Sequence, residues 1–193
     1  MSRIAFAWLL SYLLGAIPTG WLLVRTTARV DLRTIGSGNI GATNALRAAG
    51  PWMGLAVLLL DGLKGWLAVR VIAPAIMTSP DLGARLACGV LAVLGHDFPI
   101  TLKFRGGKGV ATTIGAVLGT MPTLALGALA GWVLVTAWCR YVSVWSLVFA
   151  ALIPSLQAAQ GQPPDAVVWG AVLAALIVVR HRGNLRRVRQ GFQ

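Results

Sequence analysis

Glutamate is absent from this 193-residue chain, so its five acidic side chains are all aspartates, and only two histidines and two cysteines accompany them. Cys88 and Cys139 lie in apolar surroundings without the CxxC spacing of redox and zinc sites. We interpret both as small buried residues. Because potential metal ligands are so few, the sequence argues against a metal site, and we expect neither a metal nor an organic cofactor.

Charged residues of either sign are also scarce, at 11% of the chain, whereas 57% of the residues are hydrophobic. The mean hydropathy of +0.77 lies far outside the range of soluble globular proteins. These values predict an integral membrane protein. The formal net charge of +12 would suggest nucleic acid binding in a soluble domain. In a membrane protein basic residues instead set the orientation, and we expect no nucleic acid partner.

The apolar stretches predict an all-α fold, because a membrane-spanning helix needs about 20 residues. Spans are predicted at 4–24, 51–73, 82–96, 141–160 and 164–180. The remaining stretch, 109–138, is too long for one helix across a hydrocarbon core of about 30 Å. We expect "GTMPT" at 119–123 to divide it into two. The prediction is a single domain, residues 1–193, with seven transmembrane helices.

The positions of the basic residues predict the orientation, because cytoplasmic loops collect Lys and Arg. An outside N-terminus and a cytoplasmic C-terminus place most of them on the inner side. These are Arg25, Arg29, Arg33, Arg47, Lys103, Arg105, Lys108, Arg140, Arg180, Arg182, Arg186, Arg187 and Arg189. An even number of helices would send Arg140 and the arginines after it to the other side. The charge pattern therefore favours seven.

This topology brings three unusual polar sequences to the cytoplasmic face. The first, "GSGNIGATNALR" at 36–47, combines glycines with hydroxyl and amide side chains. Such a composition frees backbone N–H groups for an anion and surrounds them with uncharged hydrogen-bonding groups. The alternative is an ordinary polar turn with an N-cap before the next helix.

The second polar sequence, "GHDFPITLKFRGGKGVATT" at 95–113, contains a glycine-rich segment around Lys108. It is not a Walker A loop, because Gly109 follows Lys108 where that motif has Ser or Thr. A lysine among glycines at a helix N-terminus nevertheless suits a phosphate group. The alternative is a flexible, positively charged loop. His96, next to Asp97, is either an acid–base group or a structural residue.

Two further features stand out. In the third polar sequence, "RHRGNLRR" at 180–187, His181 and Asn184 share one helix face, although the arginines alone fit a topological anchor or a contact for anionic lipid. "DGLKG" places Asp61 and Lys64 in the middle of the apolar stretch 51–73. Charges at that depth suggest function, and the alternative is an ion pair that faces the bundle interior.

These four motifs together resemble the bacterial acyl-phosphate:glycerol-3-phosphate acyltransferase family, the PlsY type, in the same order and with about the same spacing. The resemblance implies a seven-helix enzyme of the bacterial plasma membrane, multi-pass, with its active site facing the cytoplasm. It implies transfer of an acyl group from acyl phosphate to glycerol 3-phosphate, giving lysophosphatidate and inorganic phosphate. The expected partners are those two substrates and membrane lipid.

The resemblance also implies roles for individual residues. It places His181, Asn184, Lys108 and Ser37 in the catalytic centre. We expect Ser37 to bind substrate there and not to act as a nucleophile. Substrate binding falls to Gly36, Gly38, Asn39, Thr43, Asn44, Arg47, Lys64, His96, Gly106, Gly107 and Gly109. The family motif commonly ends with an acidic residue, and Gln193 stands at that position here.

We expect direct transfer, because an acyl phosphate is already activated and the chain has no Ser/His/Asp order typical of a triad. The proton acceptor is left open between His181, His96 and the substrate's own phosphate. An anion transporter, with Asp61 and Lys64 in its pathway, is the alternative function. A scaffold that binds anionic lipid through its arginines is a third.

Overall fold

The computed structural model describes residues 2–139 and 142–189, which form helices and connecting turns with no strand among them. The helices are α1 (Arg3–Gly15), α2 (Thr19–Thr27), α3 (Ala42–Ala49), α4 (Pro51–Leu67), α5 (Ala73–Ile76), α6 (Leu82–Asp97), α7 (Val110–Thr120), α8 (Pro122–Cys139), α9 (Val142–Ala159) and α10 (Pro164–Arg189). Short helical turns lie at Leu32–Thr34 and Ile100–Leu102, and a π-helical turn, Ala68–Ile72, joins α4 to α5. The predicted all-α fold is confirmed for the described residues.

Within the described residues, three helical stretches are long and apolar enough to cross a membrane: Arg3–Thr27, Leu82–Leu102 and Pro164–Asn184. Helices α7 and α9 are apolar but shorter. The predicted division of 109–138 is confirmed, because α7 ends at Thr120 and α8 begins at Pro122. Proline suits the first turn of a helix, because the N–H groups there have no acceptor within the helix and proline lacks this group.

The first predicted span, 4–24, differs from the structure because it is interrupted between α1 and α2, immediately before and at Pro18. The interruption leaves two carbonyl groups outside a regular helix. The Ala16 oxygen accepts a hydrogen bond from Oγ1 of Thr101 at 3.2 Å, and the Ile17 oxygen accepts one from Nζ of Lys64 at 2.6 Å. Inside a membrane such groups need protein partners. Those partners come from distant parts of the chain, so the stretch 4–24 alone did not reveal the break.

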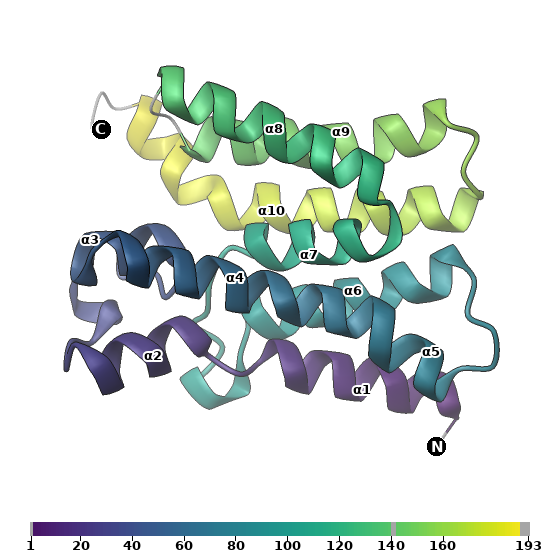
Figure 1. The fold of residues 1–193 in the computed structure, drawn as a ribbon, viewed down its shortest axis with the longest axis horizontal. Coiled ribbons are helices and arrows are strands. Elements are labelled where there is room, and N and C mark those ends of the chain that lie inside the picture. Colours follow the sequence, from purple (N-terminus) through teal and green to yellow (C-terminus); the bar gives the residue numbers. More distant parts are fainter. Residues whose placement is uncertain (1, 140–141, 190–193) are drawn as a thin grey trace.

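Helix α4 packs closely against α7, and α1 against α6, through small residues. A Cβ atom at Gly65 would overlap with the Thr112 backbone, and one at Gly95 would overlap with the backbone of α1. Small residues allow helix backbones to approach in this way. Figure 1 shows the result: α8, α9 and α10 lie along one side, α1 and α2 along the other, and α4, α6 and α7 between them.

Helix α1 begins at one end of the bundle, and α10 finishes at the opposite end (Figure 1). The end where α10 finishes also holds α2 and α3. Asp31 organises the turn between these two helices: its carboxylate accepts hydrogen bonds from Nε1 of Trp21 and from the Arg25 and Arg33 guanidinium groups. The Arg33 hydrogen bond holds the pKa of Asp31 well below its usual range, so this carboxylate is charged at neutral pH.

Candidate active site

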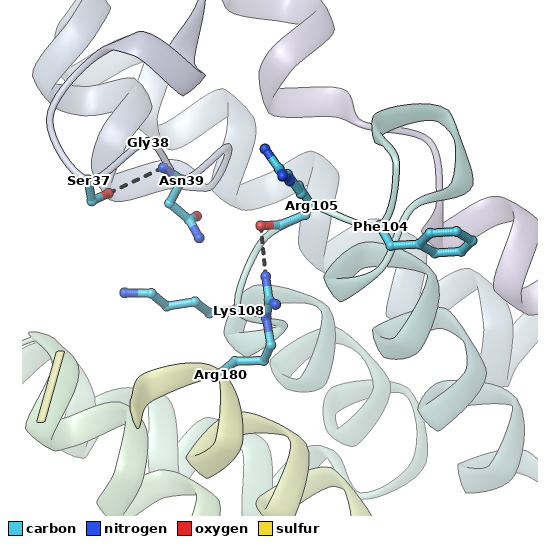
Figure 2. Close-up of a pocket in the computed structure, with 8 residues that line it drawn as sticks. Ser37, Gly38, Asn39, Phe104, Arg105, Lys108 and Arg180 are labelled. Carbon is cyan, nitrogen blue, oxygen red and sulfur yellow. Dashed lines mark hydrogen bonds between the residues drawn. The ribbon is translucent and has the colours of Figure 1, made fainter. Parts of the chain in front are cut away.

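Two polar loops and the end of α10 enclose a cleft of about 280 Å³. Its volume is close to the lower end of the range of about 300–1,000 Å³ that small-molecule sites occupy. The cleft is lined by Ser37, Gly38, Asn39, Phe104, Arg105, Gly106, Lys108 and Arg180. In Figure 2, Ser37 and Asn39 face Lys108 and Arg105 across the opening, and the Phe104 ring points away from Lys108. The first and second polar sequences therefore meet in space.

The segment Phe104–Gly109, which we call the GGKG loop, is fixed to the end of α6 by backbone hydrogen bonds. The Gly106 N–H donates to the Asp97 carbonyl at 3.1 Å, and the Gly107 N–H donates to the His96 carbonyl at 3.0 Å. These two N–H groups therefore face the protein, not a ligand in the cleft. Gly109, with φ of 71°, caps α7, and such a left-handed conformation favours glycine. The predicted helix N-terminus beside Lys108 is confirmed.

Arg180 closes the other side of this loop. Its Nε donates to the Gly107 carbonyl at 2.9 Å, and its Nη2 donates to the carbonyls of Gly107 at 2.6 Å and Gly106 at 3.0 Å. Its guanidinium also lies 4.9 Å from the centre of the Phe98 ring. The sequence analysis treated Arg180 only as one of many basic residues. The i, i+4 spacing of Arg180 and Asn184, which places them on one helix face, is the signal that could have identified Arg180.

Lys108 joins the GGKG loop to α10. Its Nζ donates to Oδ1 of Asn184 at 3.0 Å, and Nδ2 of Asn184 donates to Oγ of Ser143 in α9 at 2.6 Å. Ser143 was not anticipated from the sequence, because nothing in its local pattern distinguishes it from other helical serines. The structure thus brings Lys108 and Asn184 together, and it fixes the orientation of the Asn184 amide.

His181 is buried one turn after Ile177, and its Nδ1 lies 2.8 Å from the Ile177 carbonyl oxygen. A carbonyl oxygen only accepts, so Nδ1 of the neutral ring carries the proton. Nε2 is then the ring atom that can accept a proton from a substrate. His181 lies next to Arg180 but is not among the residues that line the cleft.

Several residues of the first polar sequence shape the loop. Nδ2 of buried Asn44 donates to the carbonyls of Leu32, Ile35 and Asn39, at 2.8 to 3.0 Å. Oδ1 of Asn44 lies where a Cβ atom at Gly36 would overlap with it, and the φ of 55° at Gly36 also favours glycine. Asn44 therefore holds the loop that presents Ser37 and Asn39.

The other predicted site residues lie outside the cleft lining. Thr43 and Arg47 are exposed on α3, near the cleft but not part of its wall. Lys64 and His96 are buried, with 3% and 5% of their surfaces exposed. The positions of Gln193 and Arg140 lie outside the described residues.

The described residues that line the cleft include three cations, Arg105, Lys108 and Arg180, and no carboxylate. The N-terminus of α7 adds the positive end of a helix dipole. Hydroxyl and amide groups of Ser37 and Asn39 stand opposite these charges. This arrangement suits a small, phosphorylated, hydrogen-bonding molecule.

Comparisons with known proteins agree with this chemistry. The family model described as glycerol-3-phosphate acyltransferase matches residues 5–191. The glycerol-3-phosphate acyltransferase of Geobacter sulfurreducens is 45% identical over 94% of this chain and 91% of its own length. The enzyme of the same name from Nitrobacter winogradskyi is 48% identical over 97% of this chain and 92% of its own length.

Two solved structures share the fold. Both are of PlsY (YgiH), an integral membrane glycerol 3-phosphate acyltransferase, and each match covers 97% of this chain and 92% of that one. The glycerol 3-phosphate form has a TM-score of 0.90 with 36% sequence identity, and the lysophosphatidic acid form has a TM-score of 0.86 with 34% identity. On the match over residues 5–191 and these relatives, the chain belongs to the glycerol-3-phosphate acyltransferase family.

Proposed function

We propose that this chain transfers a fatty acyl group from acyl phosphate to the 1-hydroxyl of sn-glycerol 3-phosphate, giving lysophosphatidate and inorganic phosphate. The observation that carries the proposal is the cleft between Ser37–Asn39 and the GGKG loop, whose cations and helix N-terminus suit phosphate groups. The glycerol 3-phosphate and lysophosphatidic acid forms of the PlsY structures support the choice of acceptor and product.

The reaction needs two phosphorylated molecules in one site, because the donor and the acceptor both carry a phosphate. Lys108 and Arg105 supply cations to the cleft, whereas the guanidinium of Arg180 donates to the carbonyls of the GGKG loop. Ser37, Gly38 and Asn39 supply hydrogen-bonding groups on the opposite wall. We assign glycerol 3-phosphate binding to this wall together with Gly36, Thr43 and Arg47 on the adjoining loop and helix.

In the proposed transfer, the acceptor hydroxyl oxygen attacks the carbonyl carbon of the acyl phosphate. The bond from that carbon to the phosphate oxygen breaks, and phosphate leaves with the electron pair. The Lys108 ammonium lies where it can neutralise the developing charge on the phosphate, and Asn184 holds it there through the 3.0 Å hydrogen bond. No acyl-enzyme forms in this mechanism, because the donor is already activated.

The hydroxyl proton passes either to Nε2 of His181 or to the departing phosphate. Nδ1 of His181 is occupied by the Ile177 carbonyl, which leaves Nε2 available. His96 is a weaker candidate for this step. Its Nδ1 lies 3.5 Å from Oδ1 of Asp61 and its Nε2 lies against Gly107, so neither ring nitrogen is open to a proton from the substrate.

We propose seven membrane spans, with the N-terminus outside and the cleft facing the cytoplasm of a bacterial cell. The opposite placement of the start of α1 and the end of α10 is what an odd number of spans requires. The basic residues Arg25, Arg33 and Arg105 belong to segments at the end that holds the cleft, as the positive-inside rule expects.

An anion transporter is less well supported. Asp61 and Lys64 were the residues that suggested a pathway through the membrane, and they are 2% and 3% exposed. Nζ of Lys64 lies 2.7 Å from Oδ1 of Asp61 and also donates to the Ile17 carbonyl. Buried side chains that form an ion pair with each other are not available to line a path for an ion.

The testing experiment incubates purified protein in lipid with labelled glycerol 3-phosphate and either palmitoyl phosphate or palmitoyl-CoA. We expect labelled lysophosphatidate from palmitoyl phosphate alone. Lys108→Ala should lower kcat/KM by about 100-fold or more, in the range typical for loss of a transition-state donor. Lys103→Ala is the matched control, because Lys103 immediately precedes the GGKG loop, is exposed and does not line the cleft.

Failure has two distinct forms in this experiment. Equal product from palmitoyl-CoA would overturn the proposed donor. Folded protein that makes no product from either donor would overturn the acyltransferase, and uptake of labelled phosphate into sealed vesicles would then favour a transporter.

A further inference from the structure

A cluster of buried polar residues lies behind the GGKG loop and outside the cleft. Its centre is the Asp61 carboxylate in α4. Oδ1 of Asp61 accepts hydrogen bonds from Oγ1 of Thr19 and from Nζ of Lys64, and it lies 3.5 Å from Nδ1 of His96 in α6. Asp61, Lys64 and His96 are each at most 5% exposed. A substrate in the cleft cannot reach such side chains without a rearrangement of the bundle.

The cluster nevertheless touches the loop directly, through His96. The ring atom Nε2 lies against Gly107, where a Cβ atom would overlap with it. The backbone of the same residue accepts the Gly107 N–H at 3.0 Å. His96 therefore contacts Gly107 with both its ring and its carbonyl group, and Gly107 immediately precedes Lys108.

On its other side, Gly107 contacts Arg180. The Nη2 and Nε atoms of Arg180 donate to the Gly107 carbonyl at 2.6 and 2.9 Å. Gly107 is thus hydrogen-bonded to α10 through its carbonyl and to α6 through its N–H. The α10 contact is at the cleft, and the α6 contact leads to Asp61, to Lys64 and, through Lys64, to the interruption between α1 and α2 at Ile17. Contacts from Gly107 therefore lead to four segments: α10, α6, α4 and the interruption between α1 and α2.

We propose that His96, oriented by Asp61, is a positioning residue that sets the GGKG loop and with it the Lys108 side chain. This inference rests on the proposed function, since it assigns His96 and Lys64 to the support of the phosphate site and not to substrate contact. Such support matters because a displacement of about 1 Å in a catalytic group is enough to lower a rate by about 100-fold.

The experiment compares wild type with His96→Asn, which keeps a polar atom near the position of Nδ1 and has none at the position of Nε2. Hydrogen exchange of the segment 104–109 is followed without substrate. We expect the Gly106 and Gly107 amides to exchange about tenfold faster in the variant, because their protection depends on local opening of the loop. In the assay, kcat should fall about tenfold, because Lys108 acts on the departing phosphate in the transition state, with a smaller change in KM for glycerol 3-phosphate.

Ser11→Ala is the matched control. Ser11 is also buried, and its Oγ donates to the Ala7 carbonyl within α1. It should alter neither exchange in 104–109 nor kcat. The link to α4 is tested by Asp61→Asn alone and combined with His96→Asn. If Asp61 acts through His96, the double variant should have no greater effect on exchange than the stronger single variant.

Unchanged exchange in His96→Asn together with a raised KM would overturn the proposal and assign His96 to the substrate. Additive effects of Asp61→Asn and His96→Asn would overturn the role of Asp61. If Asp61→Asn fails to fold, the comparison of His96→Asn with Ser11→Ala still decides the main point. Because exchange is measured without substrate, it remains decisive even if the wild type shows no acyltransferase activity.

Discussion

Ser143 is joined to the cleft through a single side chain, that of Asn184, whose Nδ2 lies 2.6 Å from the serine Oγ. The bond makes Nδ2 the donor to Ser143 and turns Oδ1 toward Lys108. Loss of this bond removes one of the contacts that oppose a 180° flip of the amide, which would point an NH₂ group at the lysine ammonium. The orientation of the lysine therefore depends on a hydroxyl two contacts away.

We expect Ser143→Ala to lower kcat by about threefold to tenfold, which corresponds to the net value of one hydrogen bond, about 0.5–1.5 kcal/mol. Ser155→Ala is the control, because Ser155 is exposed on the same helix and its Oγ donates to the Ala151 carbonyl of that helix. Steady-state rates with both variants in lipid measure the effect. An unchanged kcat in Ser143→Ala would mean that Asn184 is held by other contacts.

At the scale of single residues, the sequence predicted the residue types of the cleft better than the hydrogen bonds that fix their positions. Lys108 and Asn184 were both assigned to the site, and they share a hydrogen bond. Arg180 and Ser143 were missed. Their roles depend on partners 73 and 41 positions away along the chain, and no local pattern encodes those contacts.

At the scale of the helices, α4 carries an ion pair where the apolar pattern alone would predict aliphatic residues. Asp61 and Lys64 lie 2.7 Å apart and are almost completely buried. Removal of one partner leaves an uncompensated buried charge, whereas removal of both leaves an apolar interior. The double substitution should therefore destabilise the protein less than the sum of the two single substitutions.

We expect Lys64→Met to lower the free energy of unfolding by about 3–5 kcal/mol, and Asp61→Leu/Lys64→Met to recover a large part of that loss. Recovery stays incomplete because the Ile17 carbonyl loses one of its two donors and keeps only the Thr19 N–H. Thermal unfolding in detergent measures both variants. A double variant no more stable than Lys64→Met would show that the pair does not compensate itself, and a double variant with full activity would contradict the role given to Asp61.

The boundaries of the helices were predictable where local rules decide them. Pro122 divides the stretch 109–138, and Gly109 caps α7, because proline and glycine act through their own backbone geometry. The interruption before Thr19 escaped prediction, although Pro18 is just as visible. A proline in an apolar stretch either kinks a helix or ends it, and the outcome here depends on Lys64 and Thr101.

For the molecule as a whole, the convergence of three polar sequences at one end was predicted from charge placement alone. The structure brings two of them, with Arg180 of the third, into one cleft. The number of spans and their orientation rest on the same charges. They are open to a direct test by cysteine labelling.

In a background with Cys88 and Cys139 replaced by alanine, we expect Ser2→Cys to react with a membrane-impermeant maleimide from outside intact cells. Thr34→Cys, at the end that holds the cleft, should react only after the membrane is opened or in inverted vesicles. Both positions are exposed. Labelling of Thr34→Cys in intact cells would reverse the proposed orientation, and labelling of both from one side would mean that the stretch Arg3–Thr27 does not cross the membrane.

The hydrogen bonds from Arg180 to the GGKG loop span 73 and 74 positions of the chain. A ribosome that adds about 5–20 residues per second makes Arg180 roughly 4 to 15 seconds after the loop itself. During that interval the glycines have been synthesised, but the guanidinium that binds their carbonyl groups has not. A partly synthesised chain therefore lacks a finished site, and the enzyme becomes competent only when α10 has been inserted beside α6.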